Sequence, residues 1–109
     1  MLLYPYTIDV DGTTTVADAV AKWGFAPAGV TIDALPTTVP VAIGRAGQDA
    51  MPALLPGLDA FTAALAARGA PVTVFDHASG PHGYDLDDRS QAASMAVAKI
   101  VQFVRARLA

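Results

Sequence analysis

The sequence predicts a single α/β domain over residues 1–109, with a small, mostly parallel sheet flanked by helices. Short apolar runs that suit strands alternate with longer segments whose apolar residues recur at helical spacing. From residue 39 onward the order is strand, loop, helix, strand, loop, helix, which is typical of parallel strands joined by right-handed crossovers. Residues 1–38 are then expected to hold the end of an N-terminal strand, a helix and a loop, and residues 39–109 the strand-helix-strand-helix core.

The composition narrows the class of protein. The chain is 53% hydrophobic and only 16% charged, which indicates that an apolar surface is buried against a partner or a missing part of the fold. A net charge of -3 without a basic stripe predicts that it does not bind nucleic acid. The absence of cysteine excludes disulfides, thiolate nucleophiles and cysteine-ligated zinc. No signal peptide and no apolar segment of bilayer length is found, so we expect a cytoplasmic protein without membrane association.

The N-terminal part begins with the apolar residues 2–4, which we interpret as the end of a strand because Pro5 interrupts the run. Val16, Val20 and Trp23 share one face of the helix expected next, and one of the three threonines before it supplies the cap. Trp23 is expected in the core or in a cap over the site. The same expectation applies to the nearby Phe25.

The first strand and helix of the core follow a proline-containing loop. Residues 39–44 form a short apolar run flanked by proline and glycine, which is typical of a buried parallel strand. The next helix is expected over residues 57–68, where Leu58, Phe61 and Leu65 lie along one stripe.

The last strand and helix enclose a loop that carries both histidines of the chain. Residues 71–75 are interpreted as a short buried strand, and His77 and His82 follow in a Gly/Pro-rich loop. Open α/β sheets place their chemistry just past the carboxyl ends of their strands, so this loop is a candidate site. The last helix is expected to begin near Asp87 or Asp88, whose charges suit a helix N-terminus.

Asp49 and His82 are the candidate catalytic residues. Each lies in a polar loop after a strand, and a single crossover helix should make the two strands neighbours. A carboxylate placed there accepts a hydrogen bond from one imidazole nitrogen and leaves the other nitrogen as a general base. The alternative is that Asp49 caps a turn and His82 forms a hydrogen bond within a tight loop. For His77 we expect packing or a hydrogen bond in preference to metal ligation.

The same stretches carry a family resemblance. Val-Ala-Ile-Gly-Arg-Ala-Gly-Gln-Asp at 41–49, Pro-Val-Thr-Val-Phe at 71–75 and Gly-Pro-His-Gly-Tyr-Asp at 80–85, followed by an amphipathic helix, resemble the C-terminal part of α/β-hydrolases. The likeness is to the dienelactone hydrolase and esterase/lipase-like branch and covers residues 39–109. It implies carboxylic-ester or lactone hydrolysis by a serine mechanism without a cofactor or metal, with Asp49 as the acid and His82 as the base.

The chain departs from that family in lacking the Gly-x-Ser-x-Gly elbow that presents the nucleophile. The serines are Ser79, Ser90 and Ser94, and only Ser79 lies close to His82 in sequence, where a turn residue is the alternative role. We therefore expect the last portion of a hydrolase whose nucleophile is elsewhere, and self-association or assembly with a complementary chain through an open sheet edge. The alternative function is a non-catalytic interaction or oligomerisation module derived from a hydrolase.

A second motif points to a different chemistry. Ile-Asp-Val-Asp-Gly-Thr at 8–13 resembles the motif of haloacid-dehalogenase-type phosphatases. This resemblance implies Asp9 as nucleophile and Asp11 as acid/base, with Mg²⁺ between them. That motif follows a hydrophobic strand, for which residues 4–7 are a poor match. The alternative is a solvated turn.

Overall fold

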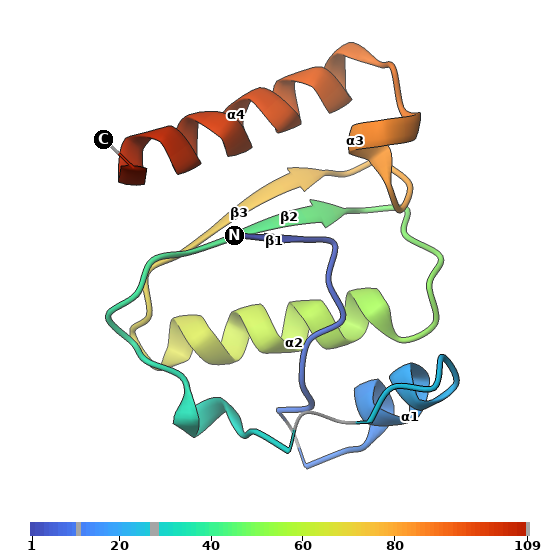
Figure 1. Ribbon diagram of the computed structural model, residues 1–109, viewed down its shortest axis with the longest axis vertical. Helices are drawn as coiled ribbons and strands as arrows, with labels where there is room; N and C mark the ends of the chain where they lie inside the picture. The colour runs from blue at the N-terminus through green and yellow to red at the C-terminus, as the bar shows by residue number, and fades with distance from the viewer. Residues whose placement is uncertain (11, 27–28, 109) are drawn as a thin grey trace. The chain divides into compact units, whose positions relative to one another are not determined.

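The computed structural model describes residues 1–10, 12–26 and 29–108 (Figure 1). Over these residues the chain is an α/β protein with three strands in one small parallel sheet, four α-helices and a short 3₁₀ helix, which confirms the predicted fold class. No helix within the described ranges is both long enough and apolar enough to cross a membrane.

The contacts between residues divide the chain into two compact units, each made from separate segments. The first unit contains residues 1–4, 41–50 and 73–108, and the second contains residues 5–40 and 51–72, apart from the positions not described. Both predicted catalytic residues belong to the first unit.

The sheet is built around its middle strand. Strand β2 (Val41–Ala46) lies between β1 (Leu2–Leu3) and β3 (Val72–His77). In the parallel register of β1 and β2, Leu2 is opposite Ile43 and Leu3 opposite Gly44. Ala42 and Ile43 are fully buried, as expected for a strand with a neighbour on each side.

Strand β3 differs from its sequence interpretation. It was expected to be buried, but Val74 is 40% exposed and the neighbouring Thr73 is exposed as well. The reason is that β3 forms an edge of the sheet, so only part of its surface faces other elements. Val72 and Phe75 are only partly exposed, and the Phe75 ring packs against Phe103 with the ring centroids 6.0 Å apart.

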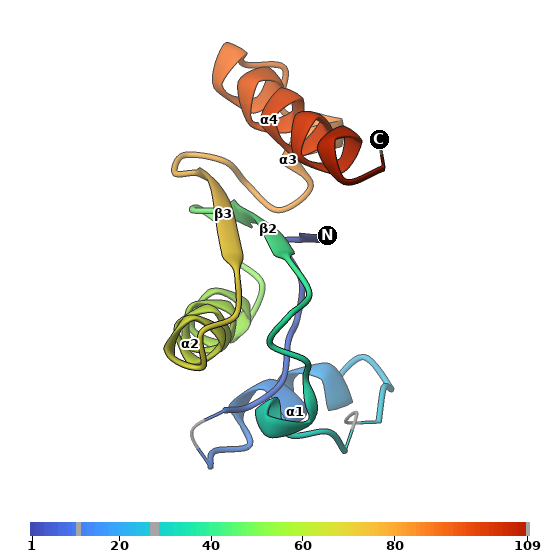
Figure 2. The ribbon, with the colours of Figure 1, turned by 90° about the vertical axis from the view of Figure 1, so that its left-hand side faces the viewer.

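Two helices complete the first unit. The long helix α4 (Gln91–Leu108) contacts β2 and the short helix α3 (Tyr84–Asp87) (Figure 2). The buried residues of α4 are Ala93, Ala96 and Ile100, which lie on one helical face. The last helix was expected to start at Asp87 or Asp88. It starts at Gln91 because residues 84–87 form a separate helical turn.

The second unit contains α1 (Thr15–Ala21), the 3₁₀ helix η1 (Ile32–Ala34) and α2 (Leu54–Ala67). Helix α2 contacts both α1 and η1, and its predicted apolar stripe is buried. Arg68 follows α2, and its guanidinium donates hydrogen bonds to the carbonyl oxygens of Ile32, Asp33 and Leu35. This one side chain therefore holds η1 against the end of α2.

The prediction that Trp23 and Phe25 belong to the core is wrong. Helix α1 ends at Ala21, before the helical face reaches Trp23, and the two aromatic residues are 59% and 69% exposed. Their alternative place in a cap over the site stays a prediction. Thr14, one of the three threonines considered for the cap of α1, occupies the N-cap position but makes no side-chain capping bond.

Candidate acid–base site

The site forms where the loops that follow β2 and β3 meet. The N–H of Gly47 donates to the carbonyl oxygen of His77, and the N–H of Gln48 donates to that of Gly80, both at 2.9 Å. A Cβ atom at position 47 would lie 2.2 Å from the carbonyl oxygen of Ala78. Only glycine therefore permits this approach, and the approach brings residues 49 and 82 together.

Asp49 and His82, the two residues predicted from the sequence, are hydrogen-bonded to each other. His82 Nδ1 lies 2.6 Å from Asp49 Oδ2. The Asp49 side chain has no exposed surface, whereas the His82 side chain is 42% exposed. An ionised carboxylate only accepts hydrogen bonds, so Nδ1 is the ring nitrogen that carries the proton. In the neutral ring, Nε2 then carries the lone pair, which is the state a general base requires.

A second His–Asp pair lies in the same unit. His77, at the end of β3, is almost fully buried, and its Nε2 is 2.7 Å from Asp88 Oδ2. The other carboxylate oxygen of Asp88 accepts the N–H of Ser90 at 2.8 Å. The hydrogen bond from His77, followed by the bonds to Ser90, lowers the pKa of Asp88 below its usual value. This pair joins the end of β3 to the start of α4 and so closes the loop that contains His82.

His77 fulfils the expectation that it forms a hydrogen bond, and the structure adds its packing. A Cβ atom at Gly80 would lie 2.4 Å from His77 Cδ2, so the loop backbone rests directly on the imidazole ring. The ring also meets Tyr84 edge-on, with the centroids 5.1 Å apart. Sequence reasoning did not pair His77 with Asp88. The Asp-x-Ser spacing of residues 88–90, which favours a local turn around the aspartate, was the available signal.

Tyr4 is a further residue of the site that sequence reasoning missed. Its ring lies 4.6 Å from that of His82 and 5.7 Å from that of Tyr84. Its hydroxyl donates a hydrogen bond to Asp85. Desolvation, then the hydrogen bond and charge of Asp85, raise the pKa of Tyr4 to about 12. No local pattern indicates this contact, because Tyr4 and Asp85 are 81 residues apart in sequence.

The serine residues take other roles. Ser79 is an exposed turn residue. The hydroxyl oxygen of Ser90 accepts the N–H of Ala93 at 3.2 Å and so caps the first turn of α4. Ser94 is exposed on that helix. Within the described residues, no serine hydroxyl forms a hydrogen bond with His82.

Comparison with protein-family models, with curated proteins and with solved structures gave no match.

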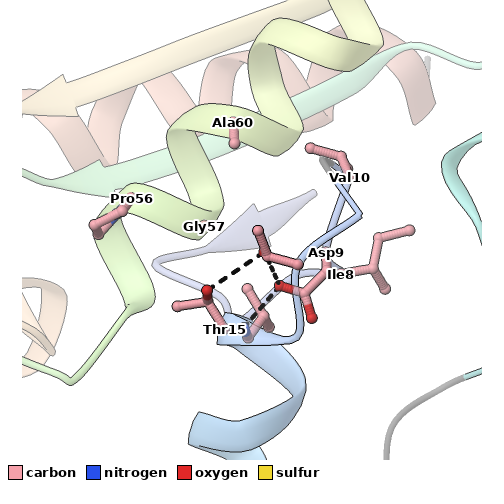
Figure 3. A pocket seen from close by; sticks show the side chains of 9 residues that line it. Ile8, Asp9, Val10, Thr15, Pro56, Gly57 and Ala60 are labelled. Atoms are coloured by element: carbon pink, nitrogen blue, oxygen red, sulfur yellow. Dashed lines mark hydrogen bonds between the residues drawn. The ribbon is translucent and has the colours of Figure 1, made fainter.

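The second motif lies in the other unit, around Asp9. The two carboxylate oxygens of Asp9 accept the N–H groups of Val16 at 2.8 Å and Ala17 at 3.0 Å. Asp9 therefore caps α1, the role that the sequence analysis gave to a threonine. Figure 3 shows its side chain beside Thr15, where it lines a small cavity of about 80 Å³. Residues 5–10 form no strand.

These contacts do not favour the phosphatase interpretation. Its nucleophile would follow a strand and face a metal ion, whereas Asp9 follows irregular backbone and both its oxygens accept backbone N–H groups. Asp11, the expected acid/base, lies outside the described residues. Among the residues that are described, no three acidic or histidine side chains gather into a possible metal site.

Proposed function

We propose that Asp49 and His82 are the acid and the base of a serine-hydrolase site, and that the first unit corresponds to the C-terminal part of an α/β-hydrolase. The observation that carries the proposal is the 2.6 Å hydrogen bond between Nδ1 of His82 and the buried carboxylate of Asp49. The loops that bear them follow neighbouring strands of a parallel sheet, which is where such sheets assemble their chemistry.

The geometry supports a defined division of roles. His82 Nε2 removes the proton of an attacking hydroxyl, and the ring becomes an imidazolium ion. Asp49 remains ionised, and its charge stabilises that ion through Nδ1. Because the Asp49 carboxylate is screened from water, this stabilisation is stronger than it would be at the surface. The imidazolium then returns the proton to the departing alcohol.

In this proposal the nucleophilic serine comes from outside these 109 residues. Ser90 already caps α4, and Ser79 lies in an exposed turn without a hydrogen bond to His82. An efficient nucleophile would lie within hydrogen-bonding reach of Nε2 and beside donors for the oxyanion. A segment of the same protein or a complementary chain would supply both.

The charges near His82 favour an uncharged substrate. Asp85, Asp87 and Asp88 follow His82 closely, and the sequence contains no lysine or arginine between Arg68 and Arg89. A substrate with its own carboxylate would be repelled by these side chains, whereas a neutral ester or lactone would not. We therefore propose uncharged carboxylic esters or lactones as the substrate class.

The test is hydrolysis of p-nitrophenyl acetate by the purified chain and its His82→Ala variant, with the solution mass recorded on the same samples. Even without the serine, His82 can activate water against this reactive ester, so we expect the substitution to lower the rate. Ser79→Ala is the matched loop control and should leave the rate unchanged. Equal rates for the wild-type chain and His82→Ala would refute the assignment of His82 as the base.

A second candidate function, a non-catalytic interaction module, is favoured by the apolar side chains at the sheet edges. Leu2 and Leu3 on β1 are 36% and 38% exposed, and Val74 on β3 is 40% exposed. Open edges of this kind pair with other strands, so we propose self-association or a complementary chain in this case. Under this function His82→Ala would change stability or assembly, measured by analytical ultracentrifugation, and leave ester hydrolysis at background.

A further inference from the structure

Tyr4 has a backbone conformation that is unusual for its residue type. Its φ angle is 31°, in the left-handed region that non-glycine residues seldom enter. Its N–H nevertheless donates to the carbonyl oxygen of Gly44 at 2.7 Å, which extends the β1–β2 pairing by one step. Strained conformations persist where surrounding contacts fix them, and they concentrate at functional sites.

The side chain of Tyr4 shows which contacts fix it. Its ring meets the His82 ring at an interplanar angle of 62°, with the centroids 4.6 Å apart. Its hydroxyl donates to Asp85, which lies three residues after His82 in α3. The Tyr4 ring makes a second ring contact, with Tyr84, which is fully buried in the core of this unit. The side chain of Tyr4, directly after β1, therefore contacts both His82 in the loop and Asp85 in the helix that follows it.

His82 needs such a support. Its side chain is 42% exposed, and its hydrogen bond to Asp49 is at one edge of the ring. A single hydrogen bond leaves an exposed imidazole able to rotate into solvent, where either nitrogen can carry the proton. An aromatic ring packed edge-to-face against it opposes that rotation.

We propose that Tyr4 is a positioning residue for His82. Its ring, anchored by its backbone to Gly44 and by its hydroxyl to Asp85, holds the imidazole in the orientation in which Nδ1 faces Asp49. The catalytic meaning of this orientation rests on the proposed function, but the orientation itself is a property of the chain and is measured without any substrate. A purely structural role for Tyr4 would affect stability and leave the state of the His82 ring unchanged in the folded molecules.

The experiment measures the His82 ring by NMR of the ¹⁵N-labelled chain, through its tautomer and the rate at which its Nδ1 proton exchanges with water. Tyr4→Leu removes the ring contact and is expected to accelerate the exchange about two- to tenfold, the range that one aromatic contact provides. Tyr4→Phe keeps the ring but removes its anchor, so a smaller acceleration is expected. Asp85→Asn weakens the same anchor from its other end and should match Tyr4→Phe.

Two controls separate positioning from loss of stability. Phe75→Leu removes the ring contact with Phe103 in the same unit and should lower stability without changing the His82 signal. Tyr6→Phe removes a tyrosine hydroxyl in the second unit, which donates to the carbonyl oxygen of Pro52. This variant should also leave the His82 signal unchanged. The proposal is overturned if Phe75→Leu accelerates the exchange as much as Tyr4→Leu. It is also overturned if all three variants of Tyr4 and Asp85 exchange like the wild-type chain.

The same variants separate this inference from the proposed function. If the NMR changes appear but hydrolysis is insensitive to His82→Ala, Tyr4 positions the ring and the serine-hydrolase proposal fails. If hydrolysis depends on His82 but the NMR signal is insensitive to Tyr4, the function stands and the positioning role is wrong. Should Tyr4→Leu fail to fold, Tyr4→Phe and Asp85→Asn give the same decision, because both retain the ring.

Discussion

Replacement of Gly47 by alanine tests the contact that brings the loops carrying Asp49 and His82 together. The new Cβ would lie 2.2 Å from the carbonyl oxygen of Ala78. Carbon–oxygen contacts need about 3.3 Å, so the loops must separate by about 1 Å. That movement strains the hydrogen bonds from Gly47 to His77 and from Gln48 to Gly80. With about 1 kcal/mol for each bond and about 1–3 kcal/mol for overpacking, we expect the free energy of unfolding to fall by about 3–5 kcal/mol in total.

The assay is urea unfolding followed by circular dichroism, together with the His82 Nδ1 proton signal. In thermal unfolding, for a domain of this size, the loss corresponds to a fall in Tm of roughly 12–40 °C. Gly24→Ala is the comparison, because its φ is 82° but its Cβ would have no atom within 4 Å. At that position we expect the free energy of unfolding to fall by only about 1 kcal/mol, because alanine is less stable than glycine in a left-handed conformation. If the free energy of unfolding of Gly47→Ala lies within about 0.5 kcal/mol of the wild-type value and the His82 signal is unchanged, this description of the site is refuted.

Three further predictions concern stability. Because the pKa of Asp88 is lowered in the folded state, its carboxylate stabilises the fold above pH 3.8, and this stability is lost as the pH falls below 3.8. In urea titrations at several pH values, the Asp88→Asn variant should therefore lose less stability at acid pH than the wild-type chain. The raised pKa of Tyr4 contributes stability that is present below pH 10.0 and is lost as the pH rises towards about 12, so Tyr4→Phe should remove that alkaline decline. Arg68→Ala should cost about 1.5–3 kcal/mol in chemical denaturation, because charged hydrogen bonds to residues 32–35 are lost, and Arg68→Lys should not restore them. A flat pH profile in the wild-type chain, or full rescue by lysine, would contradict these assignments.

The meeting of Asp49 and His82 was predictable because it follows from topology. Two parallel strands joined by one helix place their carboxyl ends side by side, so loop residues that are 33 positions apart become neighbours. The helical stripe of α2 was predictable for a similar reason, since its period is local in sequence. The catalytic role of the pair stays a prediction, because it depends on a nucleophile that these residues do not contain.

Other features required information that is not local. Tyr4 and Asp85 come into contact only when the sheet has formed, and no sequence pattern in either segment predicts the contact. The exposure of Val74 depends on β3 lying at an edge, whereas its sequence alone resembles a buried strand. Trp23 was assigned to a helical face that continues past the point where α1 ends, because helix ends are less well determined by sequence than helix interiors.

A double-mutant cycle on ester hydrolysis tests most directly whether Asp49 and His82 act as one unit. The rates of Asp49→Ala, His82→Ala and the double variant are compared with that of the wild-type chain, using p-nitrophenyl acetate. If Asp49 acts only through the His82 ring, each single substitution lowers the rate and the double variant is no slower than His82→Ala. Additive losses, or an Asp49→Ala variant with the wild-type rate, would contradict the proposed acid–base pair.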